Sequence, residues 1–343
     1  MKSPTETKAI QLIAERLREW LALAASDIVL TGKELKTGPH QFAIEWEQNS
    51  LVPSVVGAIE RLRQRIQGAE NHAIPLVAVP FMSQSGRDRC TAACISWVDL
   101  SGNAAISAPG VRILIEKKPN LYKTPGRPTS IFAPKSSRIA RWLLIHPNKW
   151  HTQREIARAT NSNEGYTSRI VARLEKNDLI VRDDSGAIRP RDPGILLEAW
   201  SEYYDFEKHS IRRGHVAARS GEQILRLLIE GLSRSSIPCA ATGLAAAWLM
   251  DSFAGFRIVT IYLAEEPTAE LLSSLDFRED ERGANVWLAV PNDEGVFHGS
   301  MKINGIRCVH PVQVYLDLSA HPERAEEAAK HLRNSHLSWR TYD

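Results

Sequence analysis

The chain is poor in cysteine, with four in 343 residues and no CxxC pair among them. Structural zinc sites and disulfide frameworks both require cysteines, alone or with histidines, at short and regular spacings. We therefore expect reduced, mostly buried thiols and no zinc site. Nothing else in the sequence leads us to expect a bound metal or a cofactor. The four residues are Cys90, Cys94, Cys239 and Cys308.

Long apolar runs are also missing. No stretch approaches the roughly 18 apolar residues that a membrane-spanning helix needs. Residues 1–25 carry charges throughout, so they predict an amphipathic helix and not an export signal. We expect a cytoplasmic protein without a membrane partner. The sequence leaves the oligomeric state open.

The chain has little net charge, but its basic charge is concentrated. Its formal net charge is +3, whereas residues 135–191 hold twelve Lys and Arg against six acids, a local charge of +6. Localised basic charge suits a phosphate backbone, because each neutralised phosphate releases condensed counterions. Duplex DNA is the predicted partner. The twelve residues are Lys135, Arg138, Arg141, Lys149, Arg154, Arg158, Arg169, Arg173, Lys176, Arg182, Arg189 and Arg191.

The same segment has the pattern of a winged helix-turn-helix. Ile139, Trp142, Leu143 and His146 share one helical face, and Pro147 ends that helix. A second helix from about 153 to 160 begins at a capping box, in which the side chains of an N-cap Thr and a Glu three residues later each bind the other's backbone amide. The box is formed by Thr152 and Glu155.

A third helix and a β-wing complete this pattern. The third helix has the core stripe Ile170, Val171 and Leu174, and it is followed by a strand, a turn at residues 184–186 and a second strand. Recognition helices read bases mainly from their N-terminal half. The residues that we expect to contact DNA are Arg154, Ser162, Tyr166, Ser168, Arg169, Arg173, Arg182, Arg189 and Arg191. A winged helix that docks proteins would show a similar pattern.

Three domains are expected, in the α/β (α+β) class. A proline-rich break at residues 117–137 separates residues 1–130 from a winged helix at 135–193, and residues 195–343 form a C-terminal α/β domain. In the first domain we expect a helix at 5–22, strands at 42–48, 74–82, 97–106 and 111–117, and helices at 53–67 and 86–96. In the last we expect helices at 195–204, 220–234, from about 244, and 268–275, strands at 256–263 and 284–291, a short strand near 303–310, and a final helix.

Four acids of the first domain are candidates for catalysis. Glu45 and Glu47 lie on one face of a predicted strand, with Asp27 upstream and Asp99 on a later strand. Converging carboxylates hold divalent metals in phosphodiester cleavage. The domain resembles the PD-(D/E)XK nuclease fold, with Asp27 and Glu45-x-Glu47 in the places of the motif, although the lysine is absent. Acids on the exposed side of a half-buried strand are the alternative interpretation.

The C-terminal domain resembles a nucleotidyltransferase fold that has lost its catalytic acids. Thr242-Gly243 stands where such folds have a phosphate-binding turn, but the next strand, IVTIYL, contains no carboxylate. Small residues that pack closely explain the turn equally well.

Several segments together resemble the AbiEi-like transcriptional-regulator antitoxins of type IV toxin–antitoxin systems. These are GYTSRIVARLE with its wing, TGLAAAWL, NVWLAVP and HPVQVYLDLSAHPERAEEAAKHLR, and the resemblance spans about residues 135–335. It implies DNA binding by residues 162–173, autorepression of a toxin operon and a cognate toxin as a second partner. We predict a regulator and not an enzyme. The alternative is a metal-dependent DNA endonuclease that the winged helix targets.

Overall fold

A computed structural model describes residues 3–24, 27–37, 39–67, 73–122, 131–253, 255–319 and 321–339. The chain forms two compact units, Met1–Pro128 and Thr129–Asp343. Among the helices within these ranges, none is long and apolar enough to cross a membrane.

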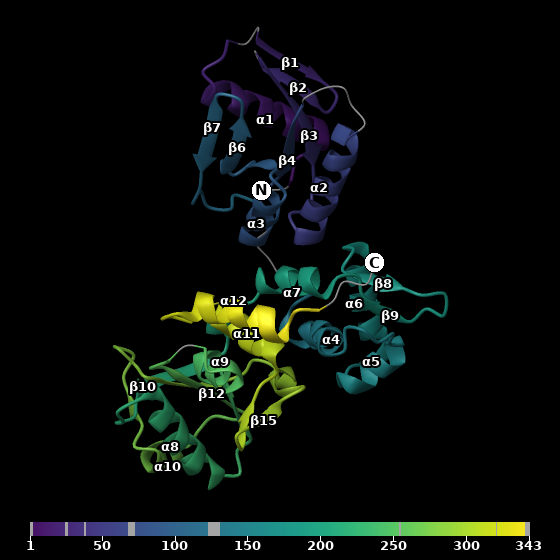
Figure 1. Cartoon of the computed structure of the whole chain (residues 1–343). Helices are drawn as coiled ribbons and strands as arrows, with labels where there is room; N and C mark the ends of the chain where they lie inside the picture. The colour runs from purple at the N-terminus through teal and green to yellow at the C-terminus, as the bar shows by residue number, and fades with distance from the viewer. Residues whose placement is uncertain are drawn as a thin grey trace. The chain divides into compact units, whose positions relative to one another are not determined.

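The N-terminal unit is built on a seven-stranded mixed sheet in which the strands lie in sequence order (Figure 1). Strands β3, β4 and β5 are parallel, whereas the pairs β1–β2, β2–β3, β5–β6 and β6–β7 are antiparallel. The elements are α1 (Glu6–Trp20), β1 (Ile28–Thr31), β2 (Glu34–Thr37), β3 (His40–Trp46), α2 (Val52–Gln67), β4 (Ile74–Val79), α3 (Gln84–Ala92), β5 (Ser96–Asp99), β6 (Ala104–Ala108) and β7 (Val111–Ile115).

Helices cover both faces of this sheet. Phe42, Ile44 and Trp46 of β3 pack with the apolar stripe of α1 in one core. Ala43 points to the other face, into the core formed by α2 and α3. This alternation confirms that Ile44 and Trp46 share one face of the strand and that Glu45 takes the other. The interpretation of Glu45 as an acid on an exposed face is wrong, because α2 covers that face and Glu45 is only 3% exposed.

The sequence analysis erred at two places in this unit. It missed the β1–β2 hairpin, whose strands have only four residues each. It also predicted one strand over 97–106, where the structure has β5 and β6 joined by a turn. The turn forms because the Asp99 carboxylate accepts a hydrogen bond from the amide of Asn103 at 2.9 Å, which reverses the chain.

The second unit contains the winged helix. Its three helices pack around Ile139, Leu143, Ile170 and Leu174, which are buried. The predicted helices, the capping box and the hairpin are confirmed. The elements are α4 (Pro134–Ile145), α5 (Gln153–Ala159), α6 (Glu164–Lys176), β8 (Ile180–Arg182) and β9 (Ile188–Pro190), followed by α7 (Pro193–Ser201).

A second seven-stranded mixed sheet follows, in the order β13-β10-β14-β12-β11-β16-β15. Its elements are η2 (Phe206–Lys208), β10 (Ser210–His215), α8 (Gly221–Ser233), β11 (Cys239–Thr242), α9 (Gly243–Asp251), β12 (Val259–Leu263), α10 (Ala269–Ser274), β13 (Arg278–Glu279), β14 (Val286–Val290), η3 (Glu294–Phe297), β15 (Met301–Ile303), β16 (Ile306–Cys308), α11 (Pro311–Leu318) and α12 (Ala325–His336). The two sheets and their helices place the chain in the mixed α/β class.

Helix α11 belongs to two cores. Val312 and Leu316 pack into the core of the winged helix, whereas Val314 and Leu318 pack into the core of the C-terminal sheet. In Figure 1, α11 lies between α4 and the segment formed by α9 and β12. We did not predict this helix from the sequence, because a helix that is buried on all sides lacks the exposed polar face that an amphipathic period requires.

Candidate nucleic-acid interface

The turn between α5 and α6 fixes the start of the recognition helix. The side chain of Thr152 accepts a hydrogen bond from the amide of Glu155, and the Glu155 carboxylate accepts one from the amide of Thr152 at 2.7 Å. Asn161 adopts a left-handed φ of 49°, which reverses the chain after α5. The side chain of Asn163 then caps α6 by accepting from the amide of Tyr166 at 2.7 Å.

Helix α6 presents a polar face outside its core stripe. Ser168 and Arg169 are exposed and Arg173 is half-buried, whereas Thr167 is buried with the stripe. Tyr166 packs partly against the core. The Arg169 guanidinium lies 6.0 Å from the centre of the Tyr166 ring, close enough for a weak cation–π contact. The outer face of α6 therefore combines hydroxyl, aromatic and guanidinium groups.

The wing is a short antiparallel hairpin that is tied to α6. Val181 pairs with Arg189, and Gly186 has a φ of 84° in the turn, which favours glycine. Two nitrogens of Arg182 donate to the carboxylate of Glu175 at 3.1 and 2.9 Å. This ion pair holds the first strand of the wing against the third helix.

The six arginines among the nine residues that we predicted to contact DNA fall into two groups. Three arginines form exposed ion pairs: Arg154 with Glu164 at 3.1 Å, Arg182 with Glu175, and Arg191 with Asp178 at 3.4 Å. Arg169, Arg173 and Arg189 form no ion pair with any residue within the described ranges. The hydroxyl of Ser162 donates to the carbonyl of Thr160 at 3.4 Å. That these nine residues bind DNA stays a prediction.

The count of twelve basic residues overstated the charge that faces solvent. Arg138 and Arg141 of α4 are buried, with 9% and 2% of their surface exposed. Arg138 donates to Asp293, and Arg141 donates to the side-chain oxygen of Gln313. A polyanion has no access to buried guanidinium groups, so these two do not belong to the interface.

Two residues lie next to the predicted contacts but were not among them. Trp150 is 40% exposed, and the Arg189 guanidinium lies 4.5 Å from the centre of its ring. The ammonium of Lys135 lies 5.7 Å from the centre of the Tyr166 ring. The signal for Trp150 was present in the sequence, since an aromatic residue beside Lys149 in a basic segment is typical of nucleic-acid interfaces.

In the N-terminal unit, three basic side chains surround the carboxylate of Glu45 and form ion pairs with it. Its two oxygens lie 2.9 Å from Lys33 Nζ and 2.9 Å from Arg65 Nη2, with Arg61 Nε at 3.4 Å. Arg61 also pairs with Glu47. Burial by itself would lower the pKa of Lys33, but its contacts with Glu6 and Glu45 outweigh burial and raise it. The carboxylate of Glu45 is thus neutralised by its neighbours.

The other two candidate acids have separate environments. Asp99 is fully buried, and its carboxylate accepts hydrogen bonds from the amides of Met82 and Asn103 and from the Asn103 side chain. Asp27 is exposed and accepts from the amide of Ala24 at 3.2 Å. Within the described part of the chain, no three His, Cys, Asp or Glu side chains are grouped so that they could hold a metal ion.

A buried polar cluster lies where the C-terminal sheet meets the winged helix. Four neutral groups donate to the carboxylate of Asp317, which is 1% exposed. Burial raises the pKa of Asp317 to about 6, against the opposing effect of these hydrogen bonds. Thr242, at the turn with small residues, is one donor and is itself buried, so this turn is closed to a phosphate. The four donors are Thr242, Tyr204, Tyr262 and Gln313.

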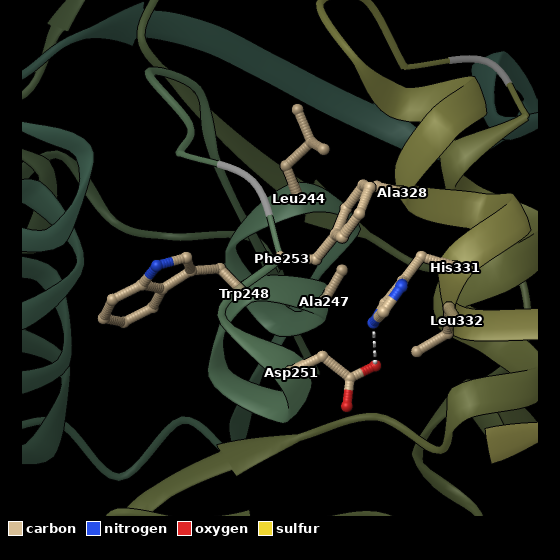
Figure 2. A pocket seen from close by; sticks show the side chains of 8 residues that line it. All are labelled: Leu244, Ala247, Trp248, Asp251, Phe253, Ala328, His331 and Leu332. Carbon is tan, nitrogen blue, oxygen red and sulfur yellow. Dashed lines mark ion pairs between the residues drawn. The ribbon is translucent and has the colours of Figure 1, made fainter. Parts of the chain in front are cut away.

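A small recess between α9 and α12 is an unpromising ligand site. Figure 2 shows Phe253 and His331 among the side chains that line it, with the ion pair between His331 and Asp251 drawn as a dashed line. The Asp251 carboxylate also contacts His336 and Ser335, each at 2.7 Å. The recess has a volume of about 10 Å³, which is about the space of one water molecule.

Residues 190–338 match the AbiEi antitoxin family. That family is described as a transcriptional regulator, the AbiEi antitoxin of a type IV toxin–antitoxin system. Residues 133–187 match the MarR family, a winged-helix family. No curated protein and no solved structure matches the chain.

The two matches divide the second unit near the end of the wing. They support the AbiEi-like regulator that the sequence motifs indicated, with a winged helix followed by an AbiEi-like C-terminal segment. The resemblance of residues 1–130 to a nuclease stays a prediction, and so does the resemblance of the last domain to a nucleotidyltransferase.

Proposed function

We propose that this protein is a transcriptional regulator that binds duplex DNA through its winged helix, in the manner of an antitoxin that represses its own operon. In this proposal α6 enters the major groove and the β8–β9 wing lies along the neighbouring backbone. Ser168, Arg169 and Arg173 contact the DNA from α6, and Arg189 contacts it from the wing.

The observation that carries the proposal is the set of basic side chains without an acidic partner. Of the twelve Lys and Arg in residues 135–191, two are buried and three are ion-paired, and the other seven form no ion pair with any residue in the described ranges. Cations without partners cost less to place against phosphates, because no existing ion pair must be broken. The seven are Lys135, Lys149, Arg158, Arg169, Arg173, Lys176 and Arg189.

The endonuclease alternative has less support. A metal-dependent nuclease needs carboxylates that are free to ligate the ion. Glu45 is buried and already contacts Lys33, Arg61 and Arg65, while Asp99 accepts hydrogen bonds from its own turn. A cognate toxin remains a proposed second partner, which the similarity to the AbiEi antitoxin family suggests.

The test is the salt dependence of DNA binding by the full-length protein, measured as fluorescence anisotropy of a labelled 30-bp duplex. The logarithm of the affinity should fall linearly with the logarithm of the salt concentration, by about 0.9 for each phosphate contact. The seven unpaired cations set an upper limit of about 6 for this slope per protomer. Affinity that barely changes between low and moderate salt would contradict the proposal.

A further inference from the structure

Arg138 joins three segments of the second unit. It lies on α4, and its Nε and Nη2 donate to the carboxylate of Asp293 at 2.8 and 2.7 Å. Its Nη1 donates to Glu294 at 3.1 Å and to the carbonyl of Thr160 at 3.4 Å. One guanidinium therefore links the first helix of the winged helix, the end of its second helix, and a loop of the C-terminal segment.

The carbonyl that Arg138 contacts lies at the turn of the helix-turn-helix. Thr160 is the C-terminal cap of α5, and Asn163, three residues later, caps α6. The hydroxyl of Ser162 also donates to the Thr160 carbonyl, and the amide of Ser162 donates to the carbonyl of Ala157 at 2.9 Å. This turn sets the angle between α5 and α6, and hence the direction in which α6 is presented to a groove.

The loop that holds Arg138 is itself closely fitted to α4. Asp293 caps η3 by accepting from the amide of Gly295 at 2.8 Å. A Cβ atom at Gly295 would lie 2.8 Å from Arg138 Cγ and 3.1 Å from Arg141 Nη1. Only a residue without a side chain allows this approach, so the backbone of the loop packs directly on the helix that carries both buried arginines.

The contact between Arg138 and Asp293 is shielded from water. The two side chains are only 11% and 10% exposed, whereas Glu294, the second acid at Arg138, is 68% exposed. Two parallel hydrogen bonds between a guanidinium and a carboxylate fix the orientation of both groups. The contact is therefore suited to fixing the position of α4 relative to the loop at Asp293, and it is too buried to bind a ligand.

We infer that Arg138 and Asp293 are positioning residues for DNA recognition, and that η3 of the C-terminal segment sets the orientation of the helix-turn-helix through them. The inference rests on the proposed function, because Arg138 and Asp293 would orient the same surface that we propose to bind DNA. It makes recognition by α6 dependent on a residue about 130 positions downstream that does not touch DNA.

One substitution should change the affinity for DNA in opposite directions, depending on whether Asp293 acts by positioning or only through its charge. Asp293→Asn removes a negative charge, which by itself strengthens the attraction of the protein for a polyanion. Loss of the bidentate contact should instead loosen the turn and weaken recognition. Glu294→Gln is the matched control, because it removes the same charge from a neighbouring acid and leaves the bidentate contact intact.

The experiment compares full-length wild type, Asp293→Asn and Glu294→Gln on two labelled duplexes, one selected from a random pool by the wild type and one of unrelated sequence. Circular dichroism establishes that each protein is folded at the temperature of the measurement. We expect Asp293→Asn to lose about tenfold in affinity for the selected duplex and little for the unrelated one. Glu294→Gln should bind both duplexes as well as the wild type or better.

Two results would overturn the inference. One is a folded Asp293→Asn protein that binds the selected duplex as tightly as Glu294→Gln does. The other applies if Asp293→Asn does not fold. Arg138→Lys keeps the positive charge and loses the paired hydrogen bonds. A folded Arg138→Lys protein that prefers the selected duplex over the unrelated one as strongly as the wild type does would then refute the inference. A wild type that binds no DNA would instead refute the proposed function, which is a distinguishable outcome.

Discussion

The winged helix and the Glu45 cluster both gather basic side chains, and they differ in what those side chains face. In the N-terminal unit, Lys33, Arg61 and Arg65 surround one buried carboxylate. On the winged helix, Arg169 and Arg173 face outward without an acid among the described residues. Similar local composition thus produces a neutralised cluster in one region and an unpaired basic face in the other.

The difference teaches that the partners of a charge, and not the charge itself, indicate a binding surface. A phosphate that approached Arg65 would have to displace Glu45, which is 3% exposed and would be left buried without a partner. Such a group costs several kcal/mol. At Arg169 nothing needs to be displaced. The first cluster therefore has a structural role, and the second fits the DNA-binding role that we propose for it.

The largest expected effect tests whether α6 is oriented as this comparison requires. Leu174 is fully buried in the core stripe. Leu174→Ala should lower the free energy of unfolding by about 2 to 5 kcal/mol, because it leaves a cavity. The matched control is Leu227→Ala on α8, where the leucine is 43% exposed and the expected loss is below about 1 kcal/mol. Urea denaturation measures both, and equal losses would mean that the stripe is not a core face.

Strong local patterns in the sequence were sufficient to predict much of this fold. The capping box at Thr152 and the stripe of Ile170 and Leu174 depend on contacts within a few residues, and both appear in the structure. The strand β10 was missed because the segment SIRRGH is charged and is ordered as a strand by tertiary pairing with β13 and β14. Helix α11 was missed because it is buried on opposite sides by two cores.

The site was harder to predict than the fold, for a similar reason. Ion pairs of Arg182 with Glu175 and of Arg138 with Asp293 depend on tertiary contacts, the second over 155 positions. A count of charges along the sequence treats these arginines and Arg169 alike. Glu45 likewise looks like a candidate metal ligand in the sequence, because its three basic neighbours are brought to it only in the fold, by the β1–β2 turn and by α2.

Asp317 is a buried acid of a different kind from Glu45. Its neighbours are neutral hydrogen-bond donors, whereas those of Glu45 are cations. Burial raises its pKa from an ordinary value of 3.8 to about 6. The unfolded chain thus releases this proton at lower pH than the folded protein does, so the contribution of Asp317 to stability is fully present below about pH 4 and is lost as the pH rises to about 6. The pKa difference corresponds to about 3 kcal/mol.

The measurement is the free energy of unfolding of the wild type and of Asp317→Asn between pH 4 and pH 7. Asparagine does not titrate, so the difference in stability between the two proteins should change up to about pH 6 and stay constant above that pH. The carboxylates of other residues are common to both proteins and cancel in the difference. A difference that is constant with pH would show that Asp317 keeps an ordinary pKa in the folded protein.

A smaller effect tests unpaired against ion-paired arginines directly. Arg169→Ala should cost about 1 to 3 kcal/mol of DNA-binding free energy and leave the fold intact. Arg154→Ala removes the same charge, but this guanidinium is already bound to Glu164, so we expect a cost of about 0.5 kcal/mol. Anisotropy titrations at one salt concentration measure both. Glu164→Gln should strengthen binding by releasing Arg154, and the reverse order of effects would mean that unpaired cations do not define the interface.

The smallest expected effect is the absence of any cleavage, and it tests the neutralised cluster. A metal ion at Glu45 would have to compete with Lys33, Arg61 and Arg65 for two carboxylate oxygens, and no lysine occupies the position that the nuclease motif requires. We predict that the protein binds a supercoiled plasmid but does not nick it with magnesium or manganese. Glu45→Ala is the control, because an authentic activity must vanish in it while DNA binding by the winged helix persists. Nicking by the wild type that disappears in Glu45→Ala would show that metal displaces the three cations, and the N-terminal unit would then be catalytic.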